Sequence, residues 1–430
     1  MVEAVYAEMK GTGRPAAVRI EDLDAPVFSA EVAAMMEAAA PFADQVPFTL
    51  DGLMAQARTE TGLDGFGTEW FREPLSLLLN ALASEVELSA FGRITASAQL
   101  LQLLKNRLAI EDLLARHPEI HDVEIRRPII IAGLPRTGTT HLHNLMSSDP
   151  SLRSLPYWES VEPVLAPGEG AEPDPRLART EAALEFLNQA LPLFKRMHEM
   201  TTWHVHEEIQ LLAIAGSTML FETMAEMPSW RNWYRSHDQT PAYEYLRTVL
   251  KVLQWQRGGT QWVLKSPQHL EQFGPLMSVF PDATFVVTHR DPVSITASLA
   301  TMVAYTARLN HRRVDPPAVG RYWADRLVDM LGSCVRDRDL LPPDHSMDVL
   351  FQDFMADDVA TVGRIYQLAG RSMTAEARAA MDAFMVEHPR GLHGAIAYDL
   401  NQFGLDRAER RRALNFYVER FGVALEDVAT

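Results

Sequence analysis

Hydrophobic positions recur at helical spacing over the first quarter of the chain. Between residues 30 and 114, leucines stand about one helical turn apart with polar residues between them, and alanine, leucine and glutamate dominate the composition. This spacing places apolar side chains on one face of each helix, so the pattern predicts a succession of amphipathic helices. We therefore expect residues 1–125 to form a helical N-terminal extension or cap.

Four short apolar runs, rich in β-branched residues, follow later in the chain. They are predicted as strands at residues 129–132, 261–265, 283–290 and 347–351. Helical patterns separate them, at residues 270–280, 295–308, 319–339 and 358–369. Strands that alternate with helices predict an α/β fold, in which a parallel sheet is flanked by helices and ligands bind at the carboxyl ends of the strands.

The remaining helical patterns complete the predicted organisation. Residues 177–252 are helical, aromatic-rich and methionine-rich, and are expected to form an insertion within an α/β core that spans residues 126–405. Residues 406–430 are expected to form a C-terminal helix, and residues 156–175, with five prolines, to form a loop. No internal repeat is present.

The first predicted strand runs into a glycine-bounded loop with the sequence IIIAGLPRTGTT over residues 129–140. Gly133 and Gly138 have the spacing of a Walker A loop and Thr140 takes its Ser/Thr position, but Thr139 replaces the lysine. The nearest cation is Arg136, inside the loop. Backbone N–H groups at the start of the following helix favour an anion, so the sequence predicts a P-loop-like phosphate site served by an arginine.

The charge of the whole chain restricts what this anion site can serve. The formal net charge is −17, which argues against a general nucleic-acid surface. Cys334 is the single cysteine, so no internal disulfide framework is expected and a reducing, cytoplasmic compartment is favoured. No apolar run in the sequence is long enough to span a bilayer, and the first residues lack the apolar core of a signal peptide.

Four motifs, in this order, resemble those of the PAPS-dependent sulfotransferases, in particular the large bacterial branch with a helical N-terminal extension. Residues 134–140 resemble the family's 5′-phosphosulfate loop, and residues 288–298 resemble its 3′-phosphate motif. Residues 263–267 resemble the strand whose lysine lies near the transferring sulfuryl group, and residues 388–405 the late segment that closes over the 3′-phosphate. The resemblance implies transfer of a sulfuryl group from PAPS (3′-phosphoadenosine 5′-phosphosulfate) to a small acceptor.

The resemblance also assigns residues to the two ends of PAPS. For the 5′-phosphosulfate it implies Arg136, Thr137, Gly138, Thr139 and Thr140. For the 3′-phosphate it implies Arg290, Ser298, Arg390 and Gly391. The chemistry agrees, because a nucleoside triphosphate needs the Walker lysine and magnesium, whereas PAPS needs a second cationic site for its separate 3′-phosphate. No metal is expected for this chemistry.

Transfer through a loose, in-line transition state needs positioned reactants, stabilised charge and a base. Arg136 and Lys265 are the predicted catalytic cations on the leaving-group side. The familiar cytosolic members place a histidine two residues after the lysine, where this chain has Pro267. The base is therefore expected in the sequence HVHEE at residues 204–208, or at His269.

Within that cluster the leading candidates for the base are Glu208 and His206. A glutamate pair at a helix start is also what the helix dipole favours, so a structural role stays open. Methionine and aromatic residues nearby suit an apolar acceptor pocket for a hydrophobic alcohol or phenol, although ordinary helix packing would account for each one singly. The expected acceptor contacts are Trp203, His204, Glu207, Met227, Trp230 and His269.

Two other functions remain open at this point. One is a P-loop kinase or other phosphotransferase, against which the missing Walker lysine argues. The other is a catalytically silent nucleotide-binding protein, which would bind PAPS or its product PAP without transfer. The expected partners are a small-molecule acceptor and PAPS or PAP, and a homo-oligomer is compatible with the sequence.

Overall fold

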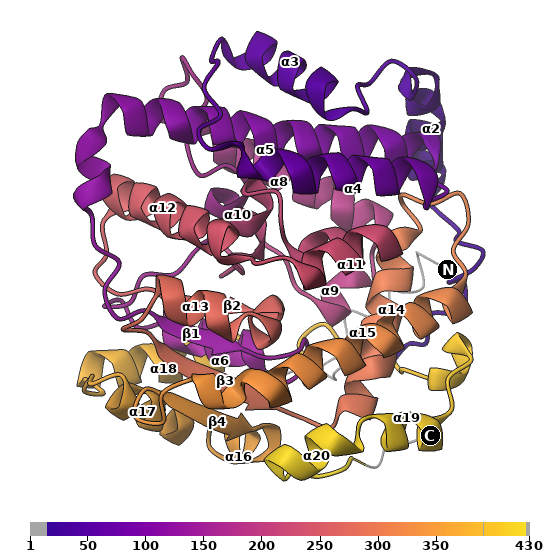
Figure 1. Ribbon diagram of the computed structural model, residues 1–430. Helices are drawn as coiled ribbons and strands as arrows, with labels where there is room; N and C mark the ends of the chain where they lie inside the picture. Colours follow the sequence, from indigo (N-terminus) through magenta and orange to yellow (C-terminus); the bar gives the residue numbers. More distant parts are fainter. Residues whose placement is uncertain (1–14, 390, 427–430) are drawn as a thin grey trace.

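A computed structural model of the chain describes residues 15–389 and 391–426 and contains a four-stranded parallel sheet (Figure 1). The strands are β1 (Ile129–Ala132), β2 (Val263–Ser266), β3 (Thr284–His289) and β4 (Ser346–Leu350), in the order β2-β1-β3-β4. Strands β1, β2 and β3 are buried at every position, as a sheet covered on both faces requires. The predicted parallel α/β fold is confirmed.

Alternate residues of each strand face opposite layers, because side chains in a strand alternate with a period of two. Ile129 and Ile131 join one hydrophobic cluster, whereas Ile130 and Ala132 join a second, larger one. The first layer consists of α6 (Thr139–Ser147), α16 (Phe351–Ala356), α17 (Asp358–Leu368) and α18 (Ala375–Glu387). The second layer includes α12 (Thr240–Arg257), α13 (Phe273–Val279), α14 (Pro292–Ala307) and α15 (Pro316–Asp337).

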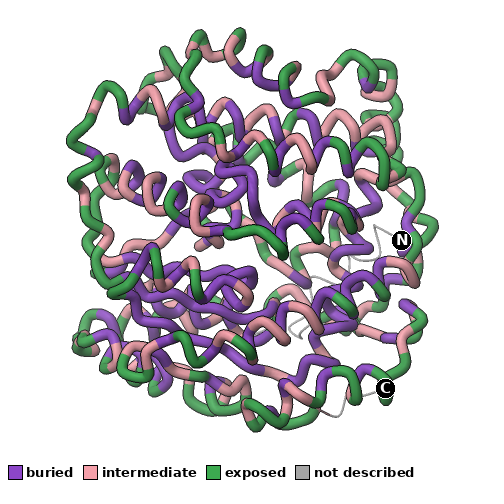
Figure 2. The backbone as a smooth tube through the Cα atoms, in the orientation of Figure 1, coloured by how far each residue is buried: buried purple, intermediate pink, exposed green. Residues whose placement is uncertain are grey.

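The N-terminal helices form a further layer beyond α12, at the top of Figure 1. They are α2 (Ala30–Ala39), α3 (Leu50–Thr61), α4 (Arg72–Ser84) and α5 (Ala90–Arg116). Thr49 and Ser89 accept hydrogen bonds from the backbone N–H groups of Gly52 and Gly92, and so cap α3 and α5. The predicted helical character of this region is confirmed, and Figure 2 shows that its inner faces continue the buried interior.

Residues 177–252 are helical but interrupted. Their helices, besides α12, are α8 (Pro175–Ala190), α9 (Phe194–Met197), α10 (Ile209–Ile214) and α11 (Pro228–Ser236). Between α9 and α10, residues 198–208 form a non-helical segment that we call the histidine strap. The backbone of the histidine strap hydrogen-bonds with the residues just before the short helix α7 (Tyr157–Val161) and with the first residues of that helix. Helix α7 lies in a segment that was expected to be a loop throughout.

The chain differs from expectation in three other places. The last strand ends at Leu350, because Phe351 already begins α16. Helix α18 was not anticipated. The C-terminal region forms two short helices, α19 (Arg407–Ala413) and α20 (Asn415–Phe421), with a break at Leu414, in place of one helix. Over residues 15–389 and 391–426, no helix combines the length and apolarity needed to cross a bilayer.

Candidate functional site

The loop after β1 is a preformed turn at the carboxyl edge of the sheet. A Cβ atom on Gly133 would lie 1.9 Å from the Thr288 hydroxyl oxygen of β3, so only glycine fits there. Arg136 has a φ of 73° and Gly138 a φ of 87°, both in the left-handed region, which is unfavourable for a side chain such as that of arginine. The Thr137 hydroxyl donates to the Leu134 carbonyl oxygen at 2.7 Å. Such strain is typical of functional loops, in agreement with the predicted anion site.

Thr139 and Thr140 begin α6 directly after this turn. The first N–H groups of a helix have no partner within it, so they remain available to an anion in front of the loop. The side chain of Arg136 extends toward the histidine strap and donates to the Met197 carbonyl oxygen at 3.3 Å. Its guanidinium also lies 6.0 Å from the centre of the Tyr398 ring.

Lys265 lies on β2 directly beside Ile131 of β1, one residue before the strand ends. Its ammonium is almost fully buried and forms an ion pair with Glu207 of the histidine strap. A buried ammonium needs such a partner. The register of the sheet thus places the predicted catalytic lysine next to the loop that follows β1.

Arg290 follows β3 and connects to the same loop, donating from Nη1 to the backbone carbonyl oxygen of Arg136 at 2.7 Å. Its Nε and Nη2 atoms hold both oxygens of the Glu426 carboxylate, at 2.6 and 2.8 Å. The C-terminal segment therefore presents a carboxylate to the arginine that was predicted to bind the 3′-phosphate.

The other residues predicted at the 3′-phosphate lie in different surroundings. Ser298 is buried on α14, two turns into the helix that follows Arg290. Gly391 lies in an exposed turn with a φ of 75°. Arg390 lies outside the described residues.

A cavity of about 350 Å³ opens beside the C-terminal segment, between the start of α14 and α19–α20, and contains none of the predicted site residues.

Glu208 is wholly buried, and each of its carboxylate oxygens has a hydrogen-bond partner. One carboxylate oxygen accepts the backbone N–H of Lys265 at 2.8 Å, and the other pairs with Nε2 of His269. The Nδ1 atom of His269 lies 2.9 Å from the Tyr243 hydroxyl. Burial acts to raise the pKa of Glu208, but the His269 charge and hydrogen bond leave that pKa below its ordinary value. Glu208 and His269 thus hold strand β2 in place at Lys265 through buried hydrogen bonds.

The histidine strap brings together three imidazoles, those of His198, His204 and His206. Burial is the main cause that lowers the pKa of His198 and of His204 to about 3, and the Lys265 charge lowers both further. Burial likewise lowers the pKa of His206 well below its ordinary value. All three rings are therefore neutral at physiological pH. His198 was missed from the sequence, because no regular period relates positions within a non-helical strap.

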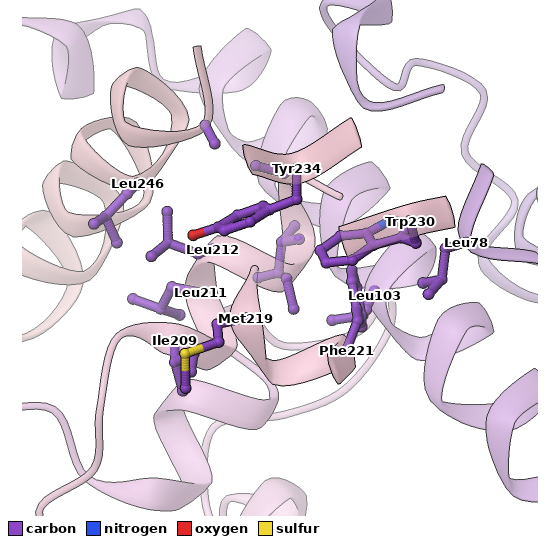
Figure 3. Close-up of a cluster of buried hydrophobic side chains, with 14 of the residues drawn as sticks. Leu78, Leu103, Ile209, Leu211, Leu212, Met219, Phe221, Trp230, Tyr234 and Leu246 are labelled. Carbon is purple, nitrogen blue, oxygen red and sulfur yellow. The ribbon is translucent and has the colours of Figure 1, made fainter. Parts of the chain in front are cut away.

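Two of the six predicted acceptor contacts lie in the hydrophobic core instead. Met227 and Trp230 are fully buried, and Figure 3 shows Trp230 packed among Tyr234, Phe221 and Leu78. The Trp230 indole N–H donates to the Pro74 carbonyl oxygen at 3.3 Å. These side chains hold the N-terminal helices onto the insertion, and we do not carry them forward as acceptor contacts. Trp203, by contrast, is 59% exposed and is available to a ligand.

Comparison with known proteins identifies relatives of this chain. A family model described as "Sulfotransferase family" matches residues 128–375, which is more than half of the chain. Omega-hydroxy-beta-dihydromenaquinone-9 sulfotransferase Stf3 of Mycobacterium bovis and of Mycobacterium tuberculosis is 24% identical over 258 residues. That match covers 56% of this chain and 62% of the length of each relative.

Two solved structures share the fold. Sulfotransferase STF1 from Mycobacterium tuberculosis H37Rv is 31% identical, with a TM-score of 0.74 and coverage of 87% of this chain and 98% of that structure. Sulfotransferase STF9 from Mycobacterium avium is 26% identical, with a TM-score of 0.79 and coverage of 88% and 98%. Both matches extend well beyond residues 128–375 and include part of the helical N-terminal region.

Proposed function

The chain belongs to the sulfotransferase family, and we propose that it transfers a sulfuryl group from PAPS to the hydroxyl of a small, hydrophobic acceptor. The observation that carries the proposal is the link between two cationic positions. The guanidinium of Arg290 contacts the backbone of Arg136, so one anion-binding loop and one separate guanidinium lie side by side. PAPS presents the matching pair of anions, a 5′-phosphosulfate and a 3′-phosphate.

The donor would be held mainly by groups already in place. The N–H groups at the start of α6 and the Arg136 side chain face the phosphosulfate, and Arg290 takes the 3′-phosphate in a bidentate contact. Glu426 occupies Arg290 in the absence of nucleotide, so its carboxylate must leave when the phosphate binds. Arg390 and Gly391 remain proposed contacts of the 3′-phosphate by family resemblance.

In the reaction, an acceptor oxygen attacks the sulfur atom while the bond from sulfur to the bridging oxygen of PAP breaks. Arg136 and Lys265 would stabilise the negative charge that develops on that bridging oxygen. The proton of the acceptor hydroxyl passes to a carboxylate. We assign this base to Glu207, because it pairs with Lys265 and keeps partial exposure.

Glu208 receives a different role in this proposal. Both of its oxygens are already bonded inside the protein, so it cannot also reach an acceptor in this arrangement. It acts as a positioning residue that fixes the Lys265 backbone. His269, whose two ring nitrogens contact Glu208 and Tyr243, completes the same support.

The acceptor class rests on two lines of support. The histidine strap and the neighbouring aromatic residues contain few free cations, which suits an apolar alcohol or phenol better than a polyanion. The name of the Stf3 relatives refers to an omega-hydroxy compound, which we extend to this chain only as a hydrophobic hydroxyl acceptor.

Calorimetric titration with PAP and with ADP, followed by PAPS-dependent sulfation of a panel of apolar alcohols and phenols, tests this function. We expect PAP to bind at least about 100-fold more tightly than ADP, since only PAP offers the 3′-phosphate. Equal affinities would refute the assignment of Arg290. PAP binding without transfer to any acceptor would indicate a silent binding protein, and magnesium-dependent turnover of ATP would indicate a phosphotransferase.

A further inference from the structure

The histidine strap contains a cluster that the transfer reaction does not use. One ring nitrogen from each of His198, His204 and His206 lies within 4.8 Å of the others. The rings of His198 and His204 have centres 5.2 Å apart, and those of His204 and His206 have centres 6.0 Å apart. Two imidazoles that share a tetrahedral metal ion at about 2 Å have ring centres about 5 Å apart, so the observed spacing is close to that of ligands.

Within the described part of the chain, one ring of this cluster lacks a hydrogen-bond partner at both nitrogens. His206 is only 7% exposed, yet neither of its ring nitrogens has a hydrogen-bond partner among the described residues. Buried polar atoms are nearly always satisfied, so a ring nitrogen of His206 is available to a ligand.

The backbone holds the strap in place around the cluster. The His206 N–H donates to the Leu155 carbonyl oxygen at 2.7 Å, and the His204 carbonyl oxygen accepts from the Tyr157 N–H at 2.9 Å. The His198 N–H caps α9 by donating to the Phe194 carbonyl oxygen at 2.8 Å. The three histidines therefore project from a fixed strap, as a preorganised ligand set must.

We propose that His198, His204 and His206 form a binding site for a divalent transition-metal ion, for which Zn²⁺ is well suited. Three imidazoles leave one position of a tetrahedral site open, which is the arrangement of metal sites that take an exchangeable oxygen ligand. This site goes beyond the proposed function, since binding of PAPS and transfer do not depend on it in the steps described above.

The charges around the cluster define what the open position would accept. Arg136 donates to the carbonyl oxygen of Met197, the residue before His198, and Lys265 pairs with Glu207, the residue after His206. Both cations therefore lie nearby, although Glu207 neutralises Lys265. Three neutral ligands leave the full positive charge on the ion. An oxygen atom that can become anionic, such as that of a water molecule, is then the favoured fourth ligand.

Titration of chelator-treated protein with Co²⁺, followed by displacement with Zn²⁺, tests the site without any assay of activity. We expect one equivalent of Co²⁺ to bind with the visible absorption of a tetrahedral nitrogen site, and Zn²⁺ to abolish that absorption. His198→Ala and His204→Ala should each weaken binding at least about 10-fold. His121→Ala, at an exposed histidine on the short helix Pro118–Asp122, is the matched control and should bind as the unaltered protein does.

Thermal unfolding of each variant distinguishes loss of a metal ligand from loss of the fold. His198 and His204 are chosen because they are partly exposed, whereas His206→Ala would also open a cavity. Absence of one-to-one binding in the unaltered protein would overturn the proposal, as would unchanged binding in both folded variants. PAP titration of the same samples keeps the two proposals apart. Normal PAP affinity without Co²⁺ binding would refute the metal site alone.

Discussion

Arg326 and Arg290 each hold carboxylates through several guanidinium nitrogens, but in different surroundings. Arg326 lies on α15, contacts Glu222 at 2.9 Å and also pairs with Glu271, and none of these side chains exceeds 4% exposure. Arg290 holds Glu426 in a similar fork, but the two side chains are 22% and 33% exposed. The same pairing therefore occurs once deep in the core and once where both side chains are partly exposed.

The difference indicates that burial, more than pairing geometry, separates the structural ion pair of Arg326 from the proposed phosphate contact of Arg290. Burial raises the pKa of Glu222 despite Arg326, and Glu271 adds to that rise, so the cluster is stable only when complete. Glu426, in contrast, can leave Arg290 for water at little cost and make room for another anion. The Lys265–Glu207 pair, with side chains 3% and 18% exposed, lies between these two cases.

Removal of the buried arginine should have the largest effect. Arg326→Met leaves two carboxylates in the core without a cation, and we expect the free energy of unfolding to fall by about 3–5 kcal/mol. Urea unfolding measures this loss. Arg336→Met, which removes an exposed pair with Asp337, is the control and should change stability by no more than about 0.5 kcal/mol. Equal stabilities of the two variants would remove the distinction between the pairs.

The Lys265–Glu207 pair, which is intermediate in burial, is tested by comparing Glu207→Gln with Glu208→Gln. If Glu207 is the base, Glu207→Gln should lower kcat by about 100-fold or more and leave KM for PAPS nearly unchanged. Glu208→Gln should act mainly on stability, by about 1–3 kcal/mol, because it disturbs a buried hydrogen-bonded carboxylate. Steady-state kinetics and urea unfolding measure both effects. A larger loss of kcat in Glu208→Gln than in Glu207→Gln would identify Glu208 as the base instead.

Removal of the exposed arginine should act on the ligand and spare the fold. Arg290→Ala is expected to weaken PAP binding about 100-fold, since it removes a bidentate charged contact, and to change ADP binding by less than about threefold. Its stability should fall by less than about 1 kcal/mol. Calorimetry with both nucleotides gives the comparison, and Arg420→Ala, at an exposed pair with Asp339, is the control. A similar loss for both nucleotides would contradict a 3′-phosphate contact.

The smallest effect is expected from the carboxylate that competes with the nucleotide. Glu426→Gln removes the charge that Arg290 must release, so PAP should bind about 3–10-fold more tightly, in line with the modest energy of a partly exposed pair. ADP affinity should not change, because ADP does not need Arg290. Unchanged PAP affinity in this variant would show that Glu426 does not compete for the arginine.

Local pattern was sufficient for much of the fold and for part of the site. The four strands lie within a few residues of their predicted places, because short apolar runs bounded by turns are read from neighbouring residues alone. The loop around Arg136 was found for the same reason, since its glycine spacing and the following helix are local features. Parallel pairing then follows from alternation of strands and helices, and it brings Lys265 beside the loop.

Tertiary structure alone decided the contacts between distant segments. Glu426 meets Arg290 from a position 136 residues away, and no periodicity in either segment indicates the other. Burial likewise separated Glu207 from its neighbour Glu208, and placed Trp230 in the core although its residue type suited a pocket. The sequence by itself thus determined the four strands and the glycine-bounded loop around Arg136, because these depend on local spacing. Which carboxylate stays partly exposed, which cation is already paired and which histidines converge depend on how the chain packs against itself.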